Sequence, residues 1–244
     1  PFINCKSAFQ VYPPVEQIAC EEECGDPLIL TPLIESGQLK EARKLSRVSH
    51  PAFRSVESYS GYFTVNKTHG SNQFFWYFEA ASRKPDAPVV LWLQGGPGSS
   101  SMFGLFSENG PFYFKRGHIN NRKYSWHKNN HLIYIDNPVG TGYSFTTDGY
   151  AQNETIIGNE LQNSLVQFFT MFPDLQKNPF YVVGESYAGK YVPAVCYAIH
   201  VKNQNATLKL NLKGFAIGNG LSDPINQLYY SDYVYQLGLV DYNG

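Results

Sequence analysis

The chain has little charge. Asp, Glu, Lys and Arg make up only 16% of its 244 residues, against roughly 25% in typical soluble domains. The 19 basic and 20 acidic residues leave a net charge of -1, so nothing draws the whole chain to nucleic acid or to an anionic membrane. No apolar run approaches the roughly 18 residues of a membrane-spanning helix. The 18 Tyr and 17 Phe exclude a disordered chain and suit a large folded core.

Cysteine is also scarce, with four residues in the chain. We expect disulfide bonds among Cys5, Cys20 and Cys24. A metal site is not expected, because no second Cys or His pair stands at zinc-ligand spacing. Cys196 lies among apolar residues of a predicted helix and is expected to be a buried free thiol. An initial methionine is missing too, so a start at Pro1 predicts a processed or truncated N-terminus.

Three Asn-X-Thr triplets are candidate glycosylation sites, at Asn66, Asn153 and Asn205. About two such triplets are expected by chance in a chain with this much Asn, Ser and Thr. They fit a protein of the secretory pathway, either secreted or lysosomal.

The chain divides into two parts of different composition. Residues 1–58 are rich in proline and polar side chains, which predicts an irregular arm that wraps a core. Beyond them, alternating and continuous apolar patterns predict strands at 59–66, 72–80, 88–94, 131–136, 180–184 and 210–217, and helices at 153–172, 187–202 and 224–237. The basic stretch 115–128 between two strands is expected to be a solvated loop or hairpin. Strands that alternate with helices indicate an α/β fold with a mostly parallel, doubly wound sheet.

One face of the predicted helix 153–172 is apolar. Asn153 is a plausible N-cap, and Pro173 ends the helix. The apolar side chains recur at helical spacing and are expected to form core: Ile157, Leu161, Leu165, Phe168 and Phe172.

The segment FYVVGESYAGKYVPA has the layout of a nucleophile elbow, in which a buried strand turns sharply into a helix at a serine. The small residues Gly184 and Ala188 flank Ser186 at minus two and plus two, which lets the strand and helix pack closely beneath it. The helix N-terminus aims backbone amides at developing negative charge. This arrangement predicts an α/β-hydrolase, with residues 59–244 as the N-terminal portion of its catalytic domain and the C-terminal end of the fold incomplete.

A glycine-rich loop, LWLQGGPGSSS, follows the earlier buried strand. An α/β-hydrolase takes a second oxyanion donor from a loop in this place. Gly95 and Gly96 allow a backbone amide to approach a substrate closely, because no Cβ stands in the way. A phosphate-binding loop is disfavoured, since no Lys-Ser/Thr pair follows the glycines.

The chain resembles the serine carboxypeptidase family in five blocks that occur in order: WLQGGPGSSS, residues 108–111 (ENGP), IDNPVGTGYSF, GESYAGKYVPA and IGNGLSDP. Residues 63–67 and the GLF at 104–106 resemble the vitellogenic carboxypeptidase-like branch. The resemblance runs from about residue 25 to the last residue, so it does not cover the first three cysteines.

This resemblance implies roles for several residues. Ser186 would be the nucleophile, and the amides of Gly96 and Tyr187 would form the oxyanion hole. The C-terminal carboxylate of a peptide substrate would be received by Gln94, Glu108, Glu185 and the amide of Gly95. No metal or organic cofactor is implied.

Two positions depart from the family pattern. Gln94 stands where the family usually has Asn, and the extra methylene moves the amide by over an ångström. Ser99 stands where the family usually has Cys, so one disulfide of the family is not expected.

The proposed carboxylate pocket would bring three negative charges together when substrate binds. Repulsion and desolvation raise carboxyl pKa values, so Glu108 and Glu185 must share protons with the substrate to make hydrogen bonds. We therefore expect binding to be favoured at acid pH, as in a lysosomal or endosomal setting.

The catalytic base is missing. In this fold the acid and the histidine follow the serine, but the one later histidine, His200, lies roughly 20 Å along the predicted helix from the elbow. His131 is expected to be structural. The resemblance places the acid and base beyond residue 244, in a missing C-terminal segment or a second chain, so the 244-residue chain alone is expected to be inactive. Two alternatives are a non-catalytic relative that binds peptide C-termini or a partner protein, and an esterase of the same fold.

Overall fold

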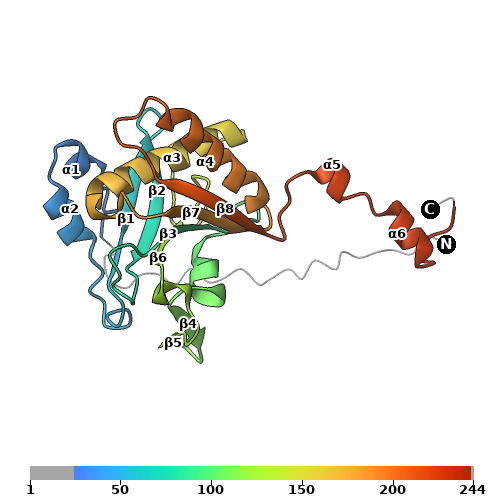
Figure 1. Cartoon of the computed structure of the whole chain (residues 1–244), viewed down its shortest axis with the longest axis horizontal. Coiled ribbons are helices and arrows are strands. Elements are labelled where there is room, and N and C mark those ends of the chain that lie inside the picture. The colour runs from blue at the N-terminus through green and yellow to red at the C-terminus, as the bar shows by residue number, and fades with distance from the viewer. Residues whose placement is uncertain (1–24, 243–244) are drawn as a thin grey trace.

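The structure, a computed structural model, describes residues 25–242 and is built on one six-stranded sheet (Figure 1). The strands are β1 (Ser58–Asn66), β2 (Ser71–Phe78), β3 (Val89–Leu93), β6 (His131–Ile135), β7 (Phe180–Glu185) and β8 (Leu212–Gly218), in the spatial order β1-β2-β6-β3-β7-β8. The strands from β6 to β8 run parallel, whereas β2 pairs antiparallel with both β1 and β6. The predicted mostly parallel sheet and the six predicted strands are confirmed, with ends that differ by at most two residues.

Two long helices pack together on one face of the sheet. They are α3 (Glu154–Met171) and α4 (Ala188–Asn203). The predicted apolar face of α3 is confirmed as core, because Leu161, Leu165 and Phe168 are fully buried in the same cluster as Leu91 and Val182 of the sheet. A second apolar cluster lies on the other face, under the short π-helical segment η1 (Gly104–Glu108) and the hairpin of β4 (Phe112–Lys115) and β5 (His118–Asn121).

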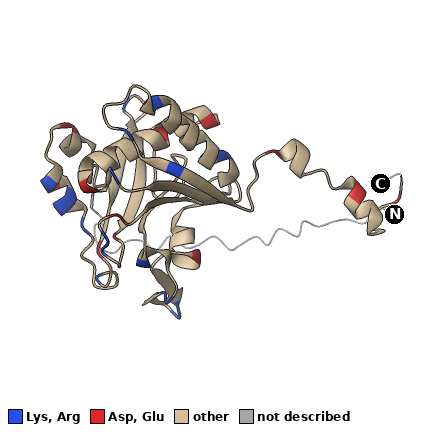
Figure 2. Cartoon of the chain, viewed as in Figure 1, with Lys and Arg blue, Asp and Glu red and all other residues tan. Residues whose placement is uncertain are grey.

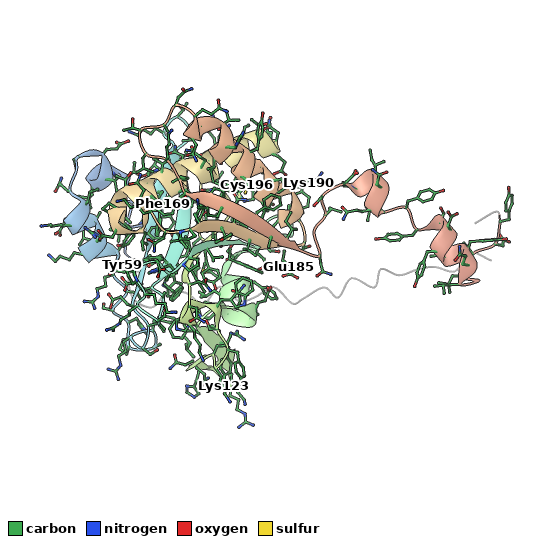
Figure 3. The ribbon with its side chains drawn as sticks, viewed as in Figure 1. Tyr59, Lys123, Phe169, Glu185, Lys190 and Cys196 are labelled. Atoms are coloured by element: carbon green, nitrogen blue, oxygen red, sulfur yellow. The ribbon has the colours of Figure 1, made fainter. Side chains whose placement is uncertain are left out.

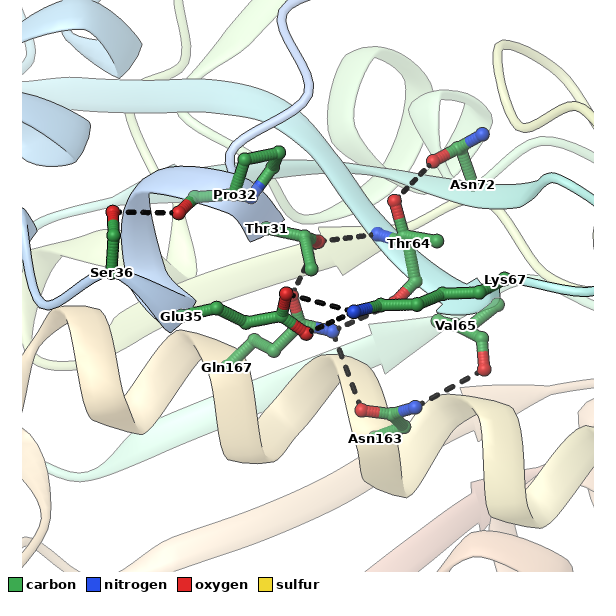
Figure 4. Close-up of polar contacts among 10 residues, drawn as sticks. All are labelled: Thr31, Pro32, Glu35, Ser36, Thr64, Val65, Lys67, Asn72, Asn163 and Gln167. Carbon is green, nitrogen blue, oxygen red and sulfur yellow. Dashed lines mark hydrogen bonds and ion pairs between the residues drawn. The ribbon is translucent and has the colours of Figure 1, made fainter.

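The segment before β1, expected to be irregular, contains two short helices. They are α1 (Thr31–Glu35) and α2 (Leu39–Ser46). Thr31 accepts a hydrogen bond from the Thr64 amide at 2.7 Å and donates one to Gln167 at 2.6 Å, which ties α1 to both β1 and α3 (Figure 4). Leu30 and Ala42 are fully buried in the core. The polar sequence did not predict these helices, because their stability comes from contacts with distant elements more than from local helix propensity.

The predicted helix 224–237 is wrong as a single element. The chain instead forms two short helices, α5 (Pro224–Gln227) and α6 (Ser231–Gln236), which extend away from the sheet (Figure 1). Neither helix has a buried residue. A long helix needs an apolar face packed against a neighbour, and the described residues provide none here.

The Cys196 thiol is buried and free, as predicted, and its burial raises its pKa to about 12. The other three cysteines lie outside the described residues. Two predicted glycosylation sites use their Oδ1 atoms locally: Asn153 Oδ1 caps α3 by accepting from the Ile156 amide, and Asn66 Oδ1 accepts from the Thr68 amide. Neither bond uses Nδ2, the atom to which a glycan is attached. Asn205 is exposed in the segment after α4. Glycosylation at all three sites stays a prediction. Within residues 25–242, no helix is long and apolar enough to cross a membrane.

Candidate active site

The turn between β7 and α4 has the strained geometry of a nucleophile elbow. Ser186 has φ of +58°, a conformation that is uncommon for a residue with a side chain. Its amide donates to the Gly218 carbonyl at 2.9 Å, and its carbonyl accepts from the amides of Gly189 and Leu221, also at 2.9 Å. A Cβ on Gly184 would lie 2.6 Å from that of Ala188, which explains the small residues on both sides. The structure thus exposes Ser186 at the carboxyl end of β7, a strand in which buried residues alternate with partly exposed ones, rather than the continuously buried strand that the sequence predicted.

The glycine-rich loop lies directly against this elbow, although about ninety residues separate the two in sequence. A Cβ on Gly95 would fall 2.6 Å from the Glu185 carbonyl oxygen and 3.0 Å from the Ser186 Cβ. The register of the sheet causes this approach. Leu93 pairs with Gly184, so the segments that follow the parallel strands β3 and β7 leave the sheet side by side. Gly96 follows at once, with φ of +110°, so the two segments expected to supply the amides of Gly96 and Tyr187 are neighbours.

A glutamine links two carboxylates at the same end of the sheet. The Gln94 Nε2 atom donates to Glu108 at 3.2 Å and to Glu185 at 3.1 Å. Its Oε1 atom accepts from the Trp92 indole at 3.1 Å, which fixes the orientation of the amide. Figure 3 labels Glu185 at the carboxyl end of β7. The extra methylene of Gln94 therefore does not prevent its amide from reaching both carboxylates.

The Glu185 carboxylate affects the ionisation of Glu108. Burial raises the pKa of Glu108, and the Glu185 carboxylate raises it further, while the hydrogen bond from Gln94 and the charge of Arg122 oppose the shift. Because one carboxyl of such a pair keeps a proton more readily than an isolated acid does, the pair can donate a hydrogen bond as well as accept one.

A buried aspartate, which sequence reasoning did not single out, holds the glycine-rich loop. Asp136 follows β6 and is fully buried. One oxygen accepts from the Ser100 hydroxyl at 2.6 Å and the Ser101 amide at 2.8 Å, and the other accepts from the Tyr143 amide at 2.9 Å. The Ser101 hydroxyl in turn accepts from the backbone N–H of Gln94 at 3.2 Å. The one available signal was an acid directly after a buried strand, within a block of the family resemblance.

Asp136→Asn is expected to lower the free energy of unfolding by about 1–3 kcal/mol. The asparagine NH2 group would face N–H or O–H groups that donate to the carboxylate, so at least one buried hydrogen bond would be lost. Thermal unfolding of the complete protein measures this effect. Exposed Asp86, changed to Asn in the same way, is the control and should leave the melting temperature nearly unchanged. Equal melting temperatures for the two variants would contradict a role for Asp136 in holding the loop.

Two histidines of the described residues have contacts remote from the elbow. His131 Nδ1 accepts from the Tyr77 hydroxyl at 2.7 Å and the Ala80 amide at 3.2 Å, and burial lowers its pKa to about 4. The predicted structural role of His131 is thus confirmed. His69 Nδ1 is hydrogen-bonded to the exposed Asp148 carboxylate at 2.6 Å. Within residues 25–242, no histidine is hydrogen-bonded to Ser186.

The chain is similar to known carboxypeptidases over most of its length. Residues 49–244 match the serine carboxypeptidase family model. The chain is 59% identical to a venom serine carboxypeptidase of Apis mellifera over 92% of its length, and 56% identical to a vitellogenic carboxypeptidase of Aedes aegypti over 91%. It spans about half of each relative, 49% and 47%.

A solved structure supports the same assignment. The prohormone-processing carboxypeptidase Kex1 of Saccharomyces cerevisiae has a TM-score of 0.73 and 27% identity, covering 82% of this chain and 48% of that one. The fold, the ordered sequence blocks and the close relatives agree. The chain belongs to the serine carboxypeptidase family and has the α/β-hydrolase fold, and its relatives are consistent with the vitellogenic-like branch.

Proposed function

We propose that the complete protein is a serine carboxypeptidase, which releases C-terminal residues from peptides through an acyl-enzyme on Ser186. The carboxylate pair bridged by Gln94, next to a strained serine, is the observation that carries this proposal. Other hydrolases need the serine, but a pocket with shared protons is suited to a substrate that ends in a free carboxylate.

In the proposed reaction, the Ser186 Oγ atom attacks the carbonyl carbon of the terminal peptide bond and loses its proton to a histidine. The carbonyl oxygen becomes an oxyanion, which the amides of Gly96 and Tyr187 stabilise at the N-terminus of α4. Collapse breaks the C–N bond, and the histidine gives the proton to the departing amine. Water then attacks the acyl-enzyme by the same route in reverse. The histidine and its orienting aspartate would come from sequence beyond residue 244 or from a second chain.

The carboxylate pocket would select the free C-terminus. A protonated Glu108 donates to one substrate oxygen, and the Gly95 amide donates to the other. The same interactions disfavour a neutral ester, which is why a peptidase is preferred over an esterase of the same fold. The absence of a histidine beside Ser186 within residues 25–242 is compatible with a non-catalytic relative that binds peptide C-termini. An intact mass of the natural protein that shows chain beyond Gly244, or a linked second chain, would favour the enzyme.

Glu108→Gln in the complete protein is expected to remove an ionisation from the profile of kcat/KM against pH. The raised pKa of Glu108 keeps its proton at acid pH, so binding is favoured there and weakens as the pH rises through that pKa. A glutamine stays neutral at every pH, and the fall on the alkaline side of this ionisation should disappear.

Glu79→Gln is the matched control, since burial also raises the pKa of Glu79. Glu79 follows the end of β2 that pairs with the start of β6, so it lies at the edge of the sheet opposite the elbow. Its profile should match that of the unchanged protein. A Glu108→Gln profile identical to both would refute the shared-proton pocket while leaving the nucleophile assignment intact. An acid preference, together with the three glycosylation triplets, supports a place in the secretory pathway, either secreted or lysosomal.

A further inference from the structure

A basic hairpin projects from the face of the sheet opposite α3 and α4. We use the name basic hairpin for residues 112–128, which include β4, β5 and the segment that follows them. β4 and β5 pair only with each other, in a two-stranded sheet separate from the main one. The segment contains five Lys or Arg residues, two His and no Asp or Glu. In Figure 2, the ribbon of this hairpin is blue at its Lys and Arg residues and nowhere red. A nearly neutral chain thus concentrates cations in one place.

The base of the hairpin is anchored to the body. Arg122 donates to the backbone carbonyls of Phe106 at 2.8 Å and Gly110 at 3.0 Å. Phe112 is fully buried, and the Ser55 hydroxyl donates to Asn121 at 2.8 Å. Arg122 therefore has a structural role, and these anchors hold the remaining cations on a defined surface.

Four cations of the hairpin face solvent: Lys115, Arg116, Lys123 and Lys128. Within residues 25–242, none of them forms an ion pair with a carboxylate. Carboxylates on adjoining segments are engaged elsewhere: Glu57 pairs with Arg47 at 2.6 Å, and Glu108 accepts from Gln94. The positive charge of the hairpin is therefore not neutralised by the described part of the protein.

Exposed aromatic rings stand among these cations. Tyr124 is 77% exposed, and the ammonium groups of Lys123 and Lys128 lie 5.2 and 5.9 Å from its ring centre. Phe114 and Trp126 are also exposed, at 59% and 44%. Flat rings beside cations can pack against the C–H face of a sugar ring while the cations meet its acidic groups.

We propose that the basic hairpin binds a sulfated glycan chain. Lys/Arg-rich stretches of this kind are typical of surfaces that bind polyanions such as heparin. The cations are spread over β4, the turn and the segment after β5, which suits a linear ligand with repeated sulfate groups. A membrane surface fits less well, because the turn itself is Lys115-Arg116-Gly117-His118 and offers no apolar tip for insertion. The proposal does not depend on the catalytic assignment.

The test measures binding of the complete natural protein to immobilised heparin over a series of salt concentrations. Lys115→Glu with Arg116→Glu is expected to weaken binding by about tenfold or more and to flatten the dependence on salt, because fewer counterions are released. Lys123→Glu with Lys128→Glu should do the same, so one pair remains informative if the other disturbs folding. Lys40→Glu with Lys209→Glu, an equal charge change on exposed residues of other segments, should leave binding unchanged.

Three results would overturn the proposal. The first is an absence of heparin binding at physiological salt. The second is an equal loss of affinity in the hairpin pairs and the control pair, which would indicate an effect of net charge alone. The third is binding to phosphatidylserine vesicles, lost in the hairpin pairs, without binding to heparin, which would assign the surface to membranes. Peptidase activity measured on a small peptide should be the same in all variants, so failure of this proposal and of the proposed activity can be told apart.

Discussion

Ser186→Ala in the complete protein is expected to lower kcat for peptide hydrolysis by about four orders of magnitude or more. The acyl-enzyme cannot form without the Oγ atom, and the residual rate then comes from the oxyanion hole and substrate binding alone. Steady-state assays with a blocked dipeptide measure the loss. Mass spectrometry should show that a serine-directed phosphonylating reagent modifies the unchanged protein at Ser186 and does not modify the variant there.

The fold should survive this substitution. The hydrogen bonds that hold the elbow involve the Ser186 backbone, so alanine keeps them at the same φ. Ser222→Ala is the matched control, because its hydroxyl donates to the carbonyl of Gly189, in the first turn of α4, at 3.3 Å and is not hydrogen-bonded to Ser186. Retained turnover in Ser186→Ala, with unaltered thermal unfolding, would remove the central claim of the mechanism.

Gly95→Ala is expected to lower kcat by about 10²–10³-fold, the loss that accompanies removal of one oxyanion donor. The new Cβ would meet the Tyr187 amide nitrogen and would lie 2.6 Å from the Glu185 carbonyl oxygen. These atoms belong to the backbone and cannot rotate away, so the glycine-rich loop must move from the elbow. The movement displaces Gly96 and disturbs the carboxylate site together, which kinetic measurements should record in kcat and KM.

Gly214→Ala provides the control for the added methyl group. A Cβ there would meet only the Tyr181 ring at 3.6 Å, an ordinary contact on the neighbouring strand. Its kinetics should match those of the unchanged protein. Unaltered kinetics in Gly95→Ala would mean that the approach of the two segments has no part in catalysis.

The sequence by itself predicted the elements whose pattern is local. The apolar run of β7, the small residues around Ser186 and the periodic face of α3 identified the strand, the turn and the core helix. These features follow from the two periods of side-chain direction, 2 in strands and 3.6 in helices, which a single segment displays by itself. The helices of the N-terminal arm could not be predicted in this way, because they are stabilised by packing on distant elements. The break between α5 and α6 could not be predicted either, because it reflects the lack of such packing among the described residues.

The tertiary structure decided which chemical groups meet. The sequence alone identified Ser186 as a candidate nucleophile and could state that Gln94 departs from the family pattern. Only the alignment of Leu93 with Gly184 across β3 and β7 places the Gln94 amide between Glu108 and Glu185 and brings Gly95 against Ser186. The tertiary structure likewise brings three hydrogen-bond donors to the Asp136 carboxylate. The reason is physical: sheet register and burial set distances of 3 Å between residues far apart in the chain, and no local pattern encodes such distances.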